Sequence, residues 1–78
     1  MTLRHMPASK LVLSRFGETL RALRVARHLT QEQLANEAGL HRTYVGDVER
    51  GKRNPSLKIL AKVAEALGIT LSELVKGV

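Results

Sequence analysis

The stretch from Thr30 to Glu49 constrains the fold of this chain more than any other part of its sequence. It contains two short runs with helical periodicity on either side of Gly39. Thr30 is followed three residues later by Gln33, which is the pattern of a capping box at the start of a helix. A glycine directly after a helix ends it by adopting a left-handed conformation. The stretch therefore predicts two short helices joined by a tight turn.

Small and compact side chains stand where two such helices must cross. Ala35 lies four residues before Gly39, and Val45 lies six residues after it. Helices that meet at a steep angle need a small residue at the contact, a residue tolerant of positive φ in the turn and an aliphatic side chain between them. The remaining apolar positions are Leu34, Ala38, Leu40 and Val48. These matches predict a helix-turn-helix, with its second helix at about Arg42–Arg50, in preference to a generic pair of antiparallel helices.

A first helix is predicted before this stretch, because apolar residues recur there at steps of three and four. They are Leu13, Phe16, Leu20 and Leu23. The helix is expected to begin near Leu11 or with Ser14 as its N-cap. Gly17 within it is unfavourable by about 1 kcal/mol relative to alanine, and close packing of another helix is the simplest reason for its presence. Residues 1–10 lack this period and are predicted to form a flexible arm ahead of one domain at 11–78.

Two more helices are predicted after the helix-turn-helix. Ser56 follows the helix breaker Pro55 and is expected to cap a helix that Gly68 ends. The inward residues of that helix are expected to be Leu57, Leu60, Val63, Ala64 and Leu67. Thr70 and Glu73 form a second capping box, which opens a short last helix. No strand pattern or internal repeat competes, so the predicted fold class is all-α, a compact domain of five helices.

Length and charge restrict the environment and the partners of the chain. Its 78 residues include no cysteine, so no disulfide or thiolate zinc site can stabilise a domain that is marginal at this size. Its formal charge of +6 favours a polyanionic partner, either nucleic acid or an acidic membrane surface. No apolar run approaches the roughly 20 residues that span a bilayer. We therefore expect a cytoplasmic, nucleoid-associated protein of a prokaryote, with no part in a membrane.

Patterns that favour catalysis or metal binding are missing from the sequence. It has no glycine-rich phosphate loop and no nucleophile motif. Its histidines, His5, His28 and His41, have no cysteine or carboxylate partners at ligand spacing. We therefore expect no enzymatic activity, no catalytic residue, no cofactor, no metal site and no small-molecule ligand.

Three segments of the sequence resemble the phage-repressor-like, XRE-type helix-turn-helix family. They are Thr30-Gln-Glu-Gln-Leu-Ala, Ala38-Gly-Leu-His-Arg-Thr-Tyr-Val and Val48-Glu-Arg-Gly-Lys-Arg-Asn-Pro-Ser-Leu. The resemblance covers about Phe16 to Leu74, and the short chain with Arg42-Thr-Tyr is most similar to the controller proteins of restriction-modification systems. It implies a repressor-like domain whose third helix enters the DNA major groove. The expected function is sequence-specific transcription regulation.

The third helix carries the side chains expected to read bases, which are Arg42, Thr43, Tyr44 and Asp47. Arg42 can donate two hydrogen bonds to O6 and N7 of guanine, and Thr43 offers a hydroxyl or a methyl group. Tyr44 either contacts phosphate or a deformed base step, or packs half-buried. Asp47 either accepts a hydrogen bond from a cytosine amine or repels phosphate. Gly46 brings no reading atoms.

A second set of residues is expected to contact phosphates, namely Gln31, His41, Lys52, Arg53, Asn54 and Lys58. Gln31 and His41 lie at helix N-termini, where free amides and the helix dipole favour anions. The others form a basic loop and the start of the next helix. Each of these residues alone could be a solvated surface residue, so the prediction rests on the cluster. The resemblance further implies a structural ion pair between Arg24 and Glu49.

A homodimer is predicted because one recognition helix reads too few base pairs for useful specificity. The interface is expected to include Ile59, Leu71, Val75 and Val78. The alternative is that these side chains complete the core of the monomer. A two-fold dimer would bind a pseudo-palindromic operator in double-stranded DNA, and RNA polymerase is a further candidate partner. Two other functions stay open: a stand-alone phage-type repressor, and an antitoxin-like module of the same fold that binds a protein.

Overall fold

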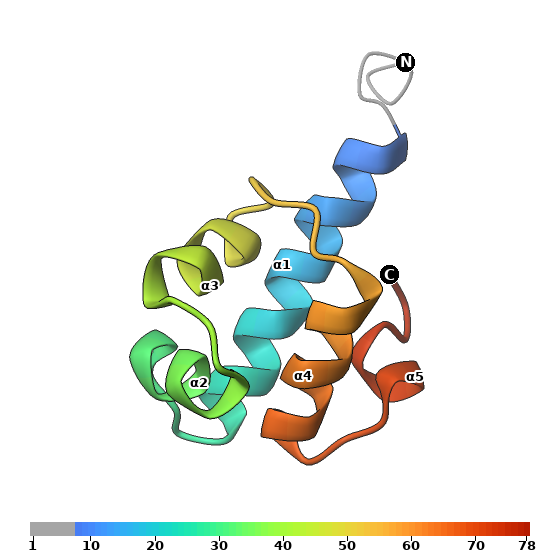
Figure 1. Cartoon of the computed structure of the whole chain (residues 1–78). Coiled ribbons are helices and arrows are strands. Elements are labelled where there is room, and N and C mark those ends of the chain that lie inside the picture. Colours follow the sequence, from blue (N-terminus) through green and yellow to red (C-terminus); the bar gives the residue numbers. More distant parts are fainter. Residues whose placement is uncertain (1–7) are drawn as a thin grey trace.

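The computed structural model describes residues 8–78, which form five α-helices joined by short connections (Figure 1). The helices are α1 (Ala8–Ala26), α2 (Gln31–Ala38), α3 (Arg42–Glu49), α4 (Leu57–Leu67) and α5 (Leu71–Leu74). The predicted all-α, five-helix fold with the helix-turn-helix at α2 and α3 is thereby confirmed. Within the described range, every helix is too short or too polar to cross a membrane.

The start of α1 differs from the prediction. The helix begins at Ala8, so residues 8–10, which were assigned to the arm, are helical, and Ser14 lies inside the helix instead of capping it. Ala8 and Lys10 are strong helix formers at exposed positions, where a helix needs no apolar period. The rest of the predicted arm, residues 1–7, lies outside the described residues.

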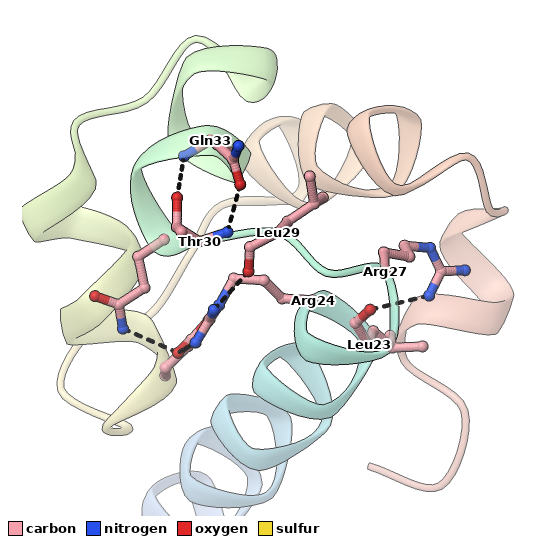
Figure 2. Close-up of polar contacts among 8 residues, drawn as sticks. Leu23, Arg24, Arg27, Leu29, Thr30 and Gln33 are labelled. Carbon is pink, nitrogen blue, oxygen red and sulfur yellow. Dashed lines mark hydrogen bonds and ion pairs between the residues drawn. The ribbon is translucent and has the colours of Figure 1, made fainter.

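Local capping contacts set the boundaries of α2 and α5, as predicted. The Thr30 N–H donates to Gln33 Oε1 at 2.8 Å, and the Gln33 N–H donates to Thr30 Oγ1 at 3.0 Å (Figure 2). Thr70 and Glu73 repeat the arrangement at 2.9 and 3.0 Å. Gly39 ends α2 with a φ of 70°. Both capping boxes and the glycine turn of the helix-turn-helix are therefore confirmed.

The core lies among the first four helices and is closed by one side chain of α5. Its buried side chains are Phe16, Leu20, Leu34, Ala35, Ala38, Val45, Val48, Val63, Ala64, Leu67 and Leu74. Leu60 was expected on the inward face of α4 and is half-buried, so the structure agrees with the prediction in part. The prediction was wrong for Leu57, which is exposed. Leu57 is the first residue of α4 and precedes the turns of that helix that pack on the core.

Gly17 marks a close contact between α1 and α3. It is buried, and a Cβ atom added to it would lie 2.6 Å from the carbonyl oxygen of Val48 and closer still to that of Glu49. The two helix backbones therefore touch where Gly17 has no side chain. This confirms the close packing expected from a glycine inside a helix, and it fixes the depth at which α3 sits on α1.

Candidate nucleic-acid interface

The first turn of α3 presents its side chains to solvent. His41 is the N-cap, and its Nδ1 accepts a hydrogen bond from the Thr43 N–H at 3.1 Å. Arg42 and Thr43 are both exposed. The Arg42 guanidinium lies 3.5 Å from a carboxylate oxygen of Glu32, whose side chain is also exposed. Because an exposed ion pair contributes little free energy, Arg42 can exchange Glu32 for another acceptor.

Tyr44 packs on the protein and also carries a cation on its ring. The side chain is half-buried against the core, so the packing role that the sequence left open is present. The guanidinium carbon of Arg53 lies 5.5 Å from the ring centroid, within the range of a cation–π contact. Tyr44 thus joins α3 to the loop that follows it. A contact between Tyr44 and DNA stays a prediction.

Asp47 has both carboxylate oxygens directed at arginines of the same chain. Its Oδ1 accepts a hydrogen bond from Arg50 Nη2 at 2.6 Å, and its Oδ2 lies 3.5 Å from Arg53 Nε. The carboxylate is therefore already engaged, and the geometry does not favour the predicted acceptance from a cytosine amine. The spacing of Asp47 and Arg50 by three residues on a helix was a signal for their contact that the sequence analysis missed.

Arg24 and Glu49 form a largely buried ion pair that ties α1 to α3. Arg24 Nε and Nη2 donate to the two oxygens of Glu49 at 2.7 and 3.0 Å, and the side chains are 11% and 4% exposed. Arg24 Nη1 also donates to the carbonyl of Leu29 at 2.8 Å (Figure 2). The hydrogen bond to Glu49 raises the pKa of Arg24 above its ordinary value. The pair is a structural element beneath the surface of the helix-turn-helix.

Gln31 at the start of α2 belongs to the same network. Its side-chain Nε2 donates to Glu49 Oε1 at 3.0 Å, so its amide is oriented by a buried acid. Gln31 also borders a polar hollow of about 220 Å³, whose lining comprises Arg21, Arg24, Gln31, Gly46, Glu49 and Arg50. Arg21 and Arg50 were not predicted at this site from the sequence. The position of Arg21 at this hollow depends on how α1 lies across α3, which no local pattern encodes.

The basic loop between α3 and α4 is exposed, as are its residues Lys52, Arg53 and Asn54. Arg53 joins this loop to the α3 surface through its contacts with Tyr44 and Asp47. Lys58 is also exposed, on the first turn of α4, but no hydrogen bond or ion pair connects it to the other site residues of the described chain. Of the predicted phosphate residues, Gln31, His41 and Arg53 therefore have side-chain hydrogen bonds or ion pairs with the rest of the site, whereas Lys52 and Asn54, like Lys58, have none among the described residues.

The residues predicted for a dimer interface divide into two groups. Ile59, Leu71 and Val78 are half-buried and pack against the core, so they serve the monomer at least in part, as the alternative reading proposed. Val75 is 37% exposed. It borders an apolar groove of about 110 Å³ that is lined by Val12, Leu13, Phe16, Asn54, Pro55, Leu60, Val75 and Val78. The exposed Val12 of α1 at this groove was missed.

Metal binding finds no support in the part of the chain that the structure describes. Across residues 8–78, histidines, cysteines and acidic residues do not gather in groups of three or more that could hold an ion. His5 lies outside this range.

Comparison with known proteins gives a consistent result. Residues 20–74 match the family HTH_3, described as helix-turn-helix. The control protein C.MunI of Mycoplasma sp is 51% identical over 61 residues, which are 77% of this chain and 82% of that protein. The immunity repressor of Bacillus phage phi105 is 51% identical over 59 residues, 76% of this chain, but the match spans only 41% of the repressor's length.

A solved structure supports the same relationship. The restriction-modification controller protein C.AhdI from Aeromonas hydrophila superposes with a TM-score of 0.78 and 55% sequence identity. The superposition covers 80% of this chain and 94% of the controller. At this level of identity the likeness extends beyond the fold to the sequence as a whole.

Proposed function

Because this chain belongs to the HTH_3 helix-turn-helix family and is a DNA-binding transcriptional regulator, we propose that it is the controller protein of a restriction-modification system. One observation carries the proposal: the identity to such controllers, 51% for C.MunI and 55% for C.AhdI, extends over most of each controller's length. The exposed arginines of α3 and of the residues that follow it supply the chemistry that the function needs.

Base reading is proposed for the first turn of α3. Arg42 and Thr43 are exposed there, and the weak pairing of Arg42 with Glu32 leaves its five donors available. In the major groove a guanidinium recognises guanine by two parallel hydrogen bonds, which no other base accepts in the same geometry. Tyr44 lies at the edge of this turn and contacts the DNA backbone or a deformed base step.

Phosphate contacts are proposed on both sides of this turn. Gln31 and His41 lie at the N-termini of α2 and α3, where the helix dipole favours anions. On the other side stand Lys52, Arg53 and Asn54, with Lys58 beyond them. These contacts position α3 in the groove and contribute little to sequence preference.

Substitutions at Arg42 and Arg53 test this division. Arg42→Ala is expected to reduce the preference for a selected operator over a scrambled duplex by about tenfold to a hundredfold, because it removes a bidentate base contact. Arg53→Ala is expected to weaken binding to both duplexes about equally and to lower the salt slope of the binding constant by about one. Fluorescence anisotropy across a series of salt concentrations measures both quantities.

The operator for this measurement comes from selection of bound sequences from a random DNA pool. Equal losses on both duplexes for Arg42→Ala would contradict base reading by Arg42. Binding of the wild-type chain that does not weaken with added salt would contradict DNA binding altogether, since phosphate contacts release counterions.

The regulator is further proposed to act as a two-fold homodimer that covers the apolar groove beside Val75. A dimer doubles the number of base pairs read and places two copies of α3 about 34 Å apart. The operator is then a pseudo-palindrome with half-sites about 10 base pairs apart. RNA polymerase is the proposed further partner at the regulated promoter.

Aspartate substitution at Val75 tests the interface. Val75→Asp is expected to give a monomer at micromolar concentration in sedimentation equilibrium, because a charge would have to be buried at the interface. Val25→Asp is the matched control: Val25 is 53% exposed but lies on the last turns of α1, and it does not border the groove. A wild-type chain that stays monomeric at all concentrations, or a Val75→Asp variant that unfolds, would contradict this interface.

A stand-alone phage-type repressor is the second candidate, because the phi105 immunity repressor is 51% identical over 59 residues. Sequencing of genomic fragments that the protein retains separates the two functions. Retained fragments beside genes for a restriction endonuclease and its methyltransferase would support the controller, and fragments confined to prophage promoters would support the repressor.

A further inference from the structure

An acidic side chain lies at the centre of the arginines on the exposed side of α3. Asp47 is held from two directions, by Arg50 on the next turn and by Arg53 in the loop, at 2.6 and 3.5 Å. Its own side chain is 22% exposed, whereas each arginine is 56% exposed. The carboxylate is therefore partly buried, and the two guanidinium groups are more exposed than it is.

The arginine of the loop is fixed by a second contact. The Arg53 guanidinium lies over the ring of Tyr44, and Tyr44 itself packs against the core. One side chain is thus held by an ion pair and by an aromatic face that belongs to the rigid part of the fold. A side chain ordered before binding loses less conformational entropy when it meets a partner.

The charges around Asp47 give its carboxylate a different effect on DNA binding from that of an unpaired carboxylate at the same position. An unpaired carboxylate there would repel phosphate. Two arginines share this one, so the local sum of the three side chains stays positive. The two guanidinium groups compensate the carboxylate of Asp47, and their ion pairs with it hold them beside α3.

We propose that Asp47 is a positioning residue, which holds Arg50 and Arg53 in the arrangement in which their guanidinium groups meet the DNA backbone. This inference rests on the proposed DNA-binding surface and deepens it. It replaces base reading by Asp47 and gives Arg50 a function at the interface. Net charge alone predicts that removal of a carboxylate strengthens binding to DNA. The proposal predicts the opposite for Asp47, because its removal releases the two arginines.

The test compares Asp47→Asn with Glu65→Gln on a random-sequence duplex of about 20 base pairs. Both substitutions remove one negative charge, but Glu65 is an exposed residue of α4 and forms no ion pair with the residues around α3. Glu65→Gln is expected to bind as well as the wild type or slightly more tightly. Asp47→Asn is expected to bind about threefold to tenfold more weakly, the effect of releasing one or two ordered side chains.

A double substitution identifies the residue through which Asp47 acts. In a chain that carries Arg53→Gln, the further change Asp47→Asn is expected to have a smaller effect on affinity than in the wild type, because it then releases Arg50 alone. A purely structural role of Asp47 would lower affinity equally in both backgrounds. Unfolding midpoints of all variants are measured by circular dichroism, and Asp47→Ala replaces Asp47→Asn if the latter loses its helical signal.

The fluorescence of Tyr44 tests the positioning without DNA. The chain has one tyrosine and no tryptophan, so its tyrosine emission reports on this surface alone. Asp47→Asn is expected to increase quenching by neutral acrylamide, because Arg53 leaves the ring more often. Arg53→Gln sets the upper limit of that increase, and Glu65→Gln is expected to match the wild type.

Four results would overturn the proposal. Tighter binding by Asp47→Asn than by Glu65→Gln would show that the carboxylate repels phosphate. Unchanged affinity for random duplex together with an altered selected sequence would show base reading. Unchanged quenching would show that Asp47 does not hold Arg53. Absence of any binding by the wild-type chain would refute the proposed function and the DNA role of Asp47 with it, while the quenching would still decide whether the carboxylate positions Arg53.

Discussion

Arg24→Ala is expected to lower the free energy of unfolding by about 3–5 kcal/mol, the usual effect of removing one member of a buried ion pair. The loss is large because Glu49, with a side chain that is 4% exposed, would lose both bonds from Arg24 and retain only the bond from Gln31. The carbonyl of Leu29 would also lose its donor. In a domain of this size each 1 kcal/mol corresponds to about 4–8 °C in the unfolding midpoint.

Arg21→Ala is the matched control for this experiment. Arg21 lies one turn earlier on α1, is exposed, and forms no ion pair among the described residues. Its substitution is expected to change stability by less than about 0.5 kcal/mol. Urea unfolding followed by circular dichroism at low temperature keeps both variants measurable. If Arg24→Ala and Arg21→Ala unfold at the same urea concentration, the buried pair does not stabilise the fold as its geometry indicates.

Features that depend on neighbouring residues could be predicted from the sequence. The capping boxes of Thr30 and Thr70 need only a side chain and a backbone amide three residues apart, so a short pattern identifies them. The turn at Gly39 is equally local, because one residue with positive φ ends the helix. These boundaries place α2, α3 and α5, and with them the helix-turn-helix.

Features that depend on packing could not be predicted in the same way. The exposed start of α1 has no apolar period to reveal it, and the exposure of Leu57 depends on where α4 meets the core. Ile59 and Leu71 are apolar in the sequence whether they face a partner or their own core, and the structure packs them partly on the core. Sequence patterns identify an apolar face but not the surface that covers it.

The candidate site also contains features that depend on neighbouring residues and features that depend on packing. Arg42 and Thr43 could be assigned to the exposed start of α3 from the helix boundary alone. The engagement of Asp47 could not, because it depends on a loop that returns Arg53 to the side of α3. The exposure of single side chains could therefore be predicted from the sequence. Contacts among side chains from different parts of the chain could be identified only in the folded structure.

Gly17→Ala is expected to destabilise the domain by about 3 kcal/mol, as overpacking does when its neighbours cannot move away. Helix propensity alone predicts the opposite sign, a gain of about 1 kcal/mol for alanine over glycine inside a helix. Packing prevails here because the new methyl group would meet backbone atoms. It would lie 2.6 Å from the carbonyl oxygen of Val48, so α3 as a whole would have to shift.

Gly46→Ala is the internal comparison, since Gly46 is also a buried glycine inside a helix. A Cβ atom there would lie 3.3 Å from Arg50 Nη1 and 3.4 Å from Gln31 Oε1, which are the ends of flexible side chains. These ends can move by a few tenths of an ångström, so the helix propensity of alanine is expected to dominate and stability to rise by up to about 1 kcal/mol. Urea unfolding of the two variants decides the matter through the sign of each change. If Gly17→Ala is as stable as Gly46→Ala, the backbones of α1 and α3 are not in close contact at Gly17. The position of the recognition helix on α1 would then have to be revised.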